Sequence, residues 1–270
     1  MQIDLTGKVA IVTGAGRGIG REIALTLAAE GVTTVTTDVR PELLDALRAD
    51  VAARGPAGLQ LACDVRDAAR IAEVVAQVVA TYGRIDVLVN NAGVAGGGPV
   101  ESLAEEVWDL NQDVNLKGTF LMCRAVAPIM KRQRSGRIIN AASFAAIVPI
   151  VGGAAYAASK AGVHYFTRVL AGELGPWNVT VNCYAPGMIP TEMNHFAEAP
   201  PAHQTRLLDT LTMRRWGEPR DVANLVCFLA SDLASYITGT LIDVSGGKLA
   251  TQIPRLPWEA AAATGEARLE

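Results

Sequence analysis

Thr13-Gly14-Ala15-Gly16-Arg17-Gly18-Ile19-Gly20 is a glycine-rich segment that separates an apolar run, residues 9–12, from a helical pattern. The helical pattern consists of Ile19, Ile23 and Leu27, which recur every four residues. Glycines at such a junction let the backbone turn tightly and approach a pyrophosphate, which the free N–H groups of the helix N-terminus can bind. Turns also use glycine for conformational reasons. The position directly after the first apolar run nevertheless predicts a dinucleotide site, with contacts from Gly14, Gly16, Arg17, Gly18, Ile19 and Gly20.

Six further apolar runs follow, and helical patterns separate them. They are residues 33–37, 59–62, 85–89, 137–142, 179–183 and 241–244. Alternation of this kind predicts parallel strands with right-handed crossovers. We therefore expect one doubly wound, Rossmann-type α/β domain over residues 1–248, with a mostly parallel seven-stranded sheet and helices on both faces. Within it, residues 188–216 are expected to form a substrate lid, and residues 249–270 a C-terminal tail.

Composition narrows the class of protein. The chain has 270 residues, a formal net charge of −3 and scattered Lys and Arg, which argues against nucleic acid or an anionic membrane surface as partners. An uncharged stretch, residues 138–159, contains Asn, Ser, Pro and Gly, so we expect no membrane span. No signal peptide or metal-ligand cluster is recognisable. We expect a cytoplasmic protein without a metal, with reduced thiols at Cys63, Cys123, Cys183 and Cys227.

Asp38 stands at the end of the second apolar run, where a carboxylate can bind the adenosine ribose hydroxyls. A carboxylate there repels a 2′-phosphate, so NAD is favoured over NADP. Arg17 and Arg40 are the counter-evidence, because either could reach that phosphate. The plainer interpretation is that Asp38 is an exposed residue of a turn.

Tyr156 and Lys160 are four residues apart and so lie on one face of a helix. A free tyrosine, with a pKa of about 10, is a poor base at neutral pH. The lysine ammonium and a positively charged nicotinamide ring would stabilise the phenolate and lower the pKa of Tyr156. Alone, such a pair is usually a solvated helix face.

The surrounding residues give this pair its meaning. From Lys8 to about Gly247, the chain resembles the short-chain dehydrogenase/reductase family. The matching landmarks, in family order and spacing, are residues 13–20, Asp64-Val65, Asn90-Asn91-Ala92-Gly93, Asn115, Ser143, Tyr156 to Lys160, Pro186-Gly187 and Thr191. Together they are highly specific, although no single one is.

The resemblance implies a role for each catalytic residue. Tyr156 is expected to be the general acid/base, and Ser143 to donate a hydrogen bond to the substrate oxygen. Lys160 is expected to bind the nicotinamide ribose and lower the pKa of Tyr156. Asn115 is expected to interrupt a long helix, residues 103–131, and hold a water linked to Lys160. The plainer alternatives are a strand-end hydrogen bond for Ser143 and a helix kink at Asn115.

The resemblance also implies the remaining cofactor contacts. Asp64 and Val65 would frame the adenine, and Pro186, Gly187 and Thr191 would orient the nicotinamide carboxamide. The further expected contacts are Asn91, Ala92, Gly93, Ile189, Tyr156 and Lys160. Asn90-Asn91 could instead form a left-handed turn, and Pro186-Gly187 an ordinary one.

The substrate is expected to lie against residues 94–98, 144–153 and 188–216. The second of these is almost wholly apolar and contains no Arg or Lys, whereas His195 and Arg206 fall in the expected lid. We therefore expect NAD(H)-dependent interconversion of a moderately hydrophobic secondary alcohol and its ketone. One alternative is a 3-oxoacyl-carrier-protein reductase, although Asp38 and Gly172 depart from the pattern of those enzymes. Another is a non-catalytic NAD-binding regulatory protein. The family resemblance also implies a homotetramer, in which helices near 103–131 and 154–174 pair between subunits.

Overall fold

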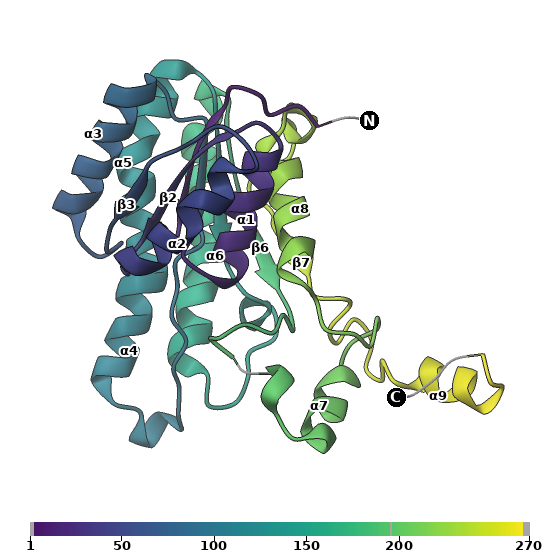
Figure 1. Ribbon diagram of the computed structural model, residues 1–270. Helices are drawn as coiled ribbons and strands as arrows, with labels where there is room; N and C mark the ends of the chain where they lie inside the picture. Colours follow the sequence, from purple (N-terminus) through teal and green to yellow (C-terminus); the bar gives the residue numbers. More distant parts are fainter. Residues whose placement is uncertain (1–2, 195, 267–270) are drawn as a thin grey trace.

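One parallel sheet organises the molecule. The computed structural model describes residues 3–194 and 196–266. Its seven strands run in the order β3-β2-β1-β4-β5-β6-β7, and every neighbouring pair is parallel (Figure 1). The strands are β1 (Val9–Thr13), β2 (Thr33–Asp38), β3 (Gln60–Ala62), β4 (Val87–Asn90), β5 (Gly136–Ala141), β6 (Val179–Pro186) and β7 (Leu241–Val244). The predicted seven-stranded α/β fold is confirmed, and the sheet is wholly rather than mostly parallel.

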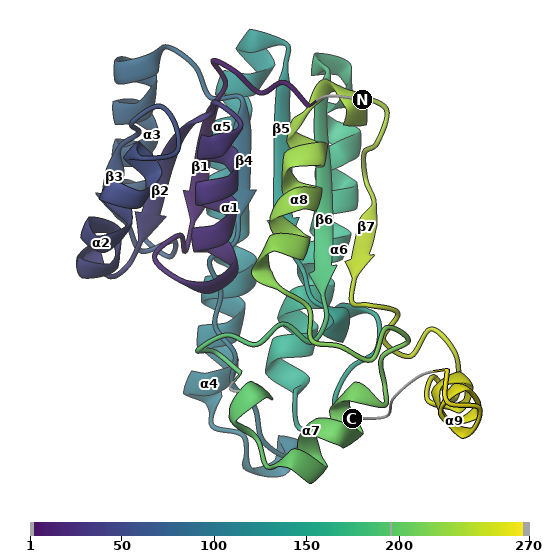
Figure 2. The same ribbon diagram turned by 45° about the vertical axis from the view of Figure 1, so that its right-hand side comes forward.

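Helices cover both faces of this sheet. In Figure 2, α1 and α8 lie in front of the strands, and α3, α5 and α6 lie behind them. The helices are α1 (Gly18–Ala29), α2 (Pro41–Ala52), α3 (Ala68–Tyr82), α4 (Glu105–Asn111), α5 (Gly118–Gln133), α6 (Ala154–Leu174), α7 (Pro201–Leu208), α8 (Pro219–Ala230) and α9 (Leu256–Ala263). This is the doubly wound arrangement that alternating strands and helices predict.

The central strand β1 shows why both faces must be covered. Ala10 and Val12 pack into the core beneath α1 and α8, whereas Val9 and Ile11 pack into the core beneath α3 and α5. Successive side chains of a strand point to opposite faces, so this continuous apolar run has no solvent side. Burial of each Val or Ile side chain contributes about 2 kcal/mol to folding.

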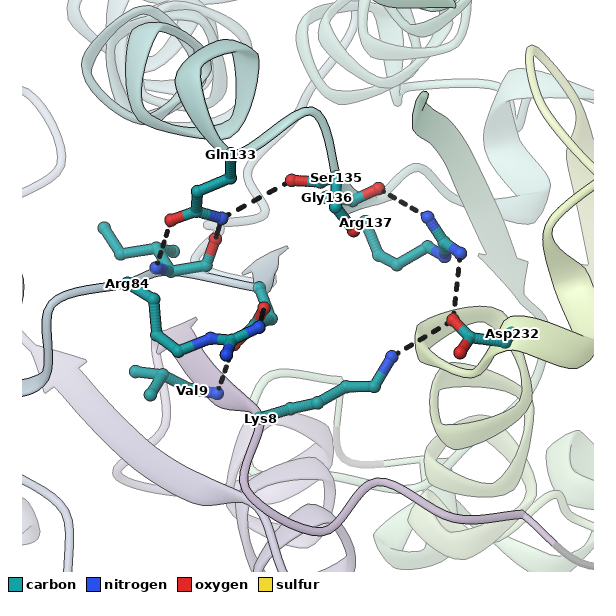
Figure 3. A network of polar contacts seen from close by, with 10 residues as sticks. Lys8, Val9, Arg84, Gln133, Ser135, Gly136, Arg137 and Asp232 are labelled. Carbon is teal, nitrogen blue, oxygen red and sulfur yellow. Dashed lines mark hydrogen bonds and ion pairs between the residues drawn. The ribbon is translucent and has the colours of Figure 1, made fainter. Parts of the chain in front are cut away.

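Polar side chains close the amino-terminal edge of the sheet (Figure 3). Asp86 accepts a hydrogen bond from the Val9 N–H at 2.8 Å, where β1 begins. Asp232 contacts both the Lys8 ammonium at 3.2 Å and the buried Arg137 guanidinium at 3.1 Å. These contacts connect β1, the segment before β4, β5 and the turn after α8.

The expected long helix over residues 103–131 is interrupted. The structure divides it into α4, a π-helical turn from Gln112 to Lys117, and α5. Such turns insert an extra residue into the helix and are frequent at functional sites. The break falls around Asn115, as the sequence analysis expects. None of the helices in the described residues is long and apolar enough to cross a membrane.

The expected lid contains a helix, and part of the expected tail does as well. Helix α7 lies beyond the carboxyl ends of the strands, and α9 lies apart from the sheet in both views (Figures 1 and 2). The Trp258 indole of α9 donates a hydrogen bond to the Thr212 carbonyl at 2.9 Å, which connects the tail to the end of the lid. His195 lies outside the described residues.

Candidate active site

A cleft of about 660 Å³ lies at the carboxyl ends of the strands. Ligands of open α/β sheets bind at this edge, where the strand order reverses between β1 and β4. The predicted site residues that line it are Gly14, Arg17, Gly18, Ile19, Gly20, Asp38, Asp64, Val65, Asn91, Ala92, Gly93, Ser143, Tyr156, Lys160, Pro186, Gly187, Ile189 and Thr191. Two others, Gly16 and Asn115, support it from behind. The structure thus brings the predicted residues together in one place.

The glycine-rich loop has the close packing that a pyrophosphate cradle requires. Gly14 has a left-handed φ of +62°, and a Cβ there would lie 2.7 Å from the Ala92 Cα. A Cβ at Gly20 would clash with the Gly14 carbonyl oxygen and the Asn91 side-chain amide. Helix α1 begins at Gly18, and no side chain caps its first N–H groups. These free donors and the open approach fit the phosphates of a dinucleotide.

Asp38 is buried at the end of β2 and is held in place by the loop. Its carboxylate accepts hydrogen bonds from the N–H groups of Gly16 and Arg40, each at 3.1 Å. The Arg40 guanidinium lies 3.7 Å from the same carboxylate, and Arg17 is paired with Glu192. Both arginines that could have favoured a 2′-phosphate therefore have carboxylate partners. Asp38 is a buried, fixed acceptor at the end of β2 rather than an exposed turn residue.

Asn91 joins the glycine loop to the strand β4. The Thr13 hydroxyl accepts a hydrogen bond from the Asn91 N–H at 3.0 Å, and the Asn91 amide donates to the Thr13 and Gly14 carbonyls at 3.1 Å. Neither Asn90 nor Asn91 has a positive φ, so the left-handed turn considered for them is wrong. The sequence analysis missed Tyr184, a buried residue of β6 whose hydroxyl donates to Asn91 Oδ1 at 3.0 Å.

Three of the predicted catalytic residues line this cleft together. Tyr156 lies in the first turn of α6, Lys160 lies one turn further on, and Ser143 follows the end of β5. The Lys160 ammonium lies 5.8 Å from the centre of the Tyr156 ring and donates a hydrogen bond to the Ala141 carbonyl at 2.8 Å. The Ser143 hydroxyl forms a hydrogen bond with the Tyr156 side chain. Ser143 also accepts from the Ala145 N–H at 3.1 Å, so the plainer strand-end role exists beside the catalytic one.

Burial shifts the pKa values of both Tyr156 and Lys160. Burial raises the pKa of Tyr156, and the hydrogen bond from Ser143 only partly opposes this shift. Burial also lowers the pKa of Lys160 to about 8. The sequence analysis expects Lys160 and a positively charged nicotinamide ring together to lower the pKa of Tyr156. In the protein without that ring, desolvation dominates and the Lys160 ammonium bonds to Ala141, so the combined effect stays a prediction. Tyr156 is therefore a neutral phenol that can donate a proton at pH 7.

Asn115 is anchored by protein groups on both sides of the π-helical turn. Its Oδ1 accepts from the Val94 N–H at 2.8 Å, and its Nδ2 donates to the Val94 carbonyl at 3.0 Å and to Ser159 Oγ at 2.9 Å. The Ser159 hydroxyl donates to the Tyr156 carbonyl at 2.7 Å. Asn115 thus connects the cleft floor to the turn of α6 that carries Tyr156. Across the described residues no hydrogen bond joins Asn115 to Lys160, and the water between them stays a prediction.

The substrate end of the cleft is mostly apolar, and the sequence analysis missed a lysine that lines it. Lys248 follows β7 and places its ammonium 5.2 Å from the centre of the Phe144 ring. Two residues expected in the wall, Ile147 and Val151, do not line the cleft, and Val151 is fully exposed. The remaining lining residues here are Val94, Ala95, Ala145, Val148, Ile150, Met188, Met193, Phe196, His203 and Leu207. Lys248 could have been predicted as a cleft residue because it follows the last strand, and the carboxyl ends of parallel strands meet at the same edge of the sheet.

Metal-ligating side chains do not gather in this cleft or elsewhere in the described chain. No group of three or more His, Cys, Asp or Glu residues is suitably placed among residues 3–194 and 196–266. The four cysteines are free and buried. The chemistry of the cleft is therefore argued from its hydroxyl, phenol and ammonium groups.

Comparisons with known proteins agree with this geometry. The family described as "Enoyl-(Acyl carrier protein) reductase" matches residues 14–248. The chain is 42% identical over 245 residues to 3-oxoacyl-(acyl-carrier-protein) reductase FabG of Thermotoga maritima, covering 90% of this chain and 98% of that protein.

Solved structures show the same fold. A putative short-chain alcohol dehydrogenase from Sinorhizobium meliloti is 38% identical with a TM-score of 0.88, covering 92% of this chain and 99% of that one. Levodione reductase is 36% identical with a TM-score of 0.87, and the match covers 91% of this chain and 99% of that one. The chain belongs to the short-chain dehydrogenase/reductase family of oxidoreductases.

Proposed function

We propose that this protein is an NAD(H)-dependent oxidoreductase that interconverts a secondary alcohol and its ketone. The observation that carries the proposal is that Tyr156, Ser143 and Lys160 all line the cleft at the carboxyl ends of the strands. A phenol and a hydroxyl that share a hydrogen bond can both contact one substrate oxygen. The family supplies the reaction class, since a nicotinamide cofactor, when bound, donates or accepts a hydride.

Each residue has a distinct task in ketone reduction. Tyr156, held neutral by burial, donates its proton to the carbonyl oxygen as negative charge develops there. Ser143 donates a second hydrogen bond to that oxygen. Lys160, with a pKa of about 8, is mostly protonated at pH 7 and stabilises the phenolate that remains. In alcohol oxidation the same steps run backwards: Tyr156 accepts the proton of the alcohol as a phenolate, which Lys160 and the positive charge of a bound oxidised nicotinamide would stabilise.

NAD is proposed in preference to NADP because of Asp38. The carboxylate is buried, and the Gly16 N–H fixes its position at the end of β2. A 2′-phosphate beside it would meet charge repulsion in a partly desolvated place. Asp64, which also lines the cleft, adds a second carboxylate whose pKa is lowered by a hydrogen bond from Arg66.

A coenzyme absorbance assay tests the function. Each coenzyme is paired with a panel of ketones and secondary alcohols, and NAD(H)-linked turnover is expected. Tyr156→Phe removes the transferable proton and should reduce kcat by at least about 1000-fold, while the Kd for NADH stays within about 3-fold. Tyr236→Phe, at a fully exposed tyrosine, is the matched control and should keep wild-type activity. Absence of wild-type turnover on the whole panel would instead favour the non-catalytic regulatory protein.

A 3-oxoacyl-carrier-protein reductase is the second candidate. It is favoured by relatives with that name, at 42% and 41% identity. Comparison of kcat/KM for 3-oxoacyl thioesters with that for simple ketones separates the two candidates. A clear preference for thioesters together with NADPH would replace the first proposal.

A homotetramer in the cytoplasm completes the proposal. Large apolar side chains are exposed on the neighbouring helices α4, α5 and α6, which is typical of surfaces that bind another subunit. They are Trp108, Phe120, Tyr165 and Val169.

A further inference from the structure

Lys248 is held in position by its backbone. Its N–H donates to Ser245 Oγ at 3.1 Å, and Lys248 pairs with Leu211 in an isolated antiparallel bridge. The neighbouring Gly247 carbonyl accepts from the Thr212 N–H at 3.3 Å. The residue therefore belongs both to the loop after β7 and to the end of the lid. Its side chain enters the cleft from a defined point.

The ammonium of Lys248 lies at the substrate end of the cleft. It is 5.2 Å from the centre of the ring of Phe144, which directly follows the catalytic Ser143. The side chain is partly buried, and this burial lowers the pKa of Lys248. Attraction to a phenylalanine ring is worth about 1 kcal/mol and supplies no hydrogen-bond acceptor. Among residues 3–194 and 196–266, this partly desolvated cation has no hydrogen-bond or ion-pair partner for its ammonium that would offset the desolvation.

The carboxylates that line the cleft are engaged elsewhere. Asp38 bonds to Gly16 and Arg40, Asp64 pairs with Arg66, and Glu192 pairs with Arg17. In the part of the chain that the structure describes, no acidic side chain forms an ion pair with Lys248. The cleft wall beside it is apolar and offers no competing anion. The chemistry that would satisfy this ammonium is a negatively charged group brought by a ligand.

We propose that Lys248 binds a carboxylate of the substrate, so that the protein acts on an oxo acid and the corresponding hydroxy acid. This inference rests on the proposed function and adds a carboxylate to the moderately hydrophobic substrate expected from the sequence. An ammonium is a compact point charge that one carboxylate can satisfy. The apolar side chains of Phe144, Val148 and Ile150 would then cover the carbon chain between that carboxylate and the ketone. Lys248 determines specificity and takes no part in the transfer of the proton.

The test compares acids with their neutral esters. Linear oxo acids, with the spacer between ketone and carboxylate lengthened one carbon at a time, are assayed beside their methyl esters. Wild type should prefer the acid of one spacer length over its ester. Lys248→Met should raise KM for that acid on the order of 10- to 100-fold, with kcat and the ester KM changed by less than about 3-fold. Lys248→Arg should recover part of the preference.

A matched control and separable outcomes complete the design. Lys131→Met removes another lysine that lies over an aromatic ring, 4.1 Å from the centre of Trp177 and outside the cleft, and should leave the acid-to-ester ratio unchanged. Turnover of esters as fast as acids by wild type would overturn the inference and leave the proposed function intact. So would a higher coenzyme KM in Lys248→Met without a change in the acid-to-ester ratio, since Lys248 would then bind the cofactor. Absence of turnover on every acid and ester would contradict the proposed function itself.

Discussion

At the scale of single residues, the site depends on a balance between burial and charge. Removing Tyr156 and Lys160 from water disfavours the charged form of each, which raises the pKa of the phenol and lowers the pKa of the ammonium. The first shift keeps Tyr156 protonated at pH 7, and the second brings the pKa of Lys160 closer to neutral, to about 8. The pair is thus prepared to donate a proton, at a cost in stability.

That cost gives a pH-dependent prediction for Lys160→Met. The pKa of Lys160 falls from 10.5 to about 8 on folding, so the unfolded chain binds more protons than the folded one between these values. Stability contributed by this residue therefore rises as pH rises through that window. The free energy of unfolding of wild type, minus that of Lys160→Met, should increase between pH 7 and pH 10 by up to roughly 3 kcal/mol. Urea unfolding at both pH values, at equal protein concentration, measures it, and a difference independent of pH would contradict the burial argument.

Coenzyme choice gives a second prediction at this scale. Asp38→Ser removes the negative charge beside the adenosine ribose and keeps a short hydrogen-bond acceptor near Gly16. The ratio of kcat/KM with NADP to that with NAD should rise by at least about 10-fold, because about 1.4 kcal/mol of repulsion is removed. Steady-state assays of both coenzymes measure this ratio. Asp45→Ser, at an exposed aspartate of α2, should leave it unchanged, and an unaltered ratio in Asp38→Ser would remove the basis for NAD.

Much of the candidate site could be predicted from the sequence because its residues follow strands. Glycine spacing, Asp38 and the Tyr156/Lys160 pair are local patterns, and a parallel sheet brings their strand ends together. The protonation of Tyr156 could not be predicted, since burial depends on side chains far away in the chain. Lys248 was missed for a related reason. Its neighbour Phe144 is more than a hundred residues distant, and only the sheet order places them together.

At the scale of elements, the close approach of neighbouring backbones explains why the loop before α1 contains glycine. Gly20 lies in the first turn of α1, and any side chain there would meet the Gly14 carbonyl and the Asn91 amide. Gly172 lies in α6, with nothing within 4 Å of the position where a Cβ would be. The two glycines are both helical, yet only the first is required by packing.

This contrast predicts opposite results for two alanine substitutions. Gly20→Ala should lower the free energy of unfolding by about 1–3 kcal/mol and raise the Kd for NADH, because the loop must move away from α1. Gly172→Ala should raise the free energy of unfolding by up to about 1 kcal/mol through helix propensity. Thermal unfolding and NADH titration measure both variants. A loss of NADH binding in Gly172→Ala, or none in Gly20→Ala, would contradict the interpretation.

Helix and strand boundaries followed the sequence pattern where one face was uniformly apolar. The seven strands were predicted within one or two residues of their observed bounds at most ends, including the edge strands β3 and β7, which are only partly buried. The π-helical turn from Gln112 to Lys117 could not be predicted as such. Its pattern is helical, and tertiary bonds such as those from Asn115 to Val94 and Ser159 and from Gln112 to Ala155 help to stabilise it. Helix α9 was also missed, because its anchors are tertiary contacts, the Trp258 hydrogen bond to Thr212 and the ion pair between Arg255 and Asp209.

At the scale of the whole molecule, the outer faces of α4 to α6 predict assembly. Wild type should sediment as a particle of about four chains, as the family resemblance implies, each chain having a mass of 28.4 kDa. Val169→Glu, at a position 61% exposed on α6, should place a charge in the interface and produce smaller particles. Tyr236→Glu, fully exposed on another part of the surface, should sediment as wild type does. A wild-type monomer at micromolar concentration would contradict the tetramer.

The antiparallel bridge between Leu211 and Lys248 has a consequence for chimeric enzymes. Two segments separated by β7 share main-chain hydrogen bonds at this point, so neither can adopt a new backbone path alone. A chimera that takes the α7 region from a relative but keeps the original loop after β7 would combine two bridge-forming segments from different proteins, which have not evolved to pair with each other. To transfer substrate preference from one relative to another, the α7 region and the loop after β7 should therefore be exchanged together.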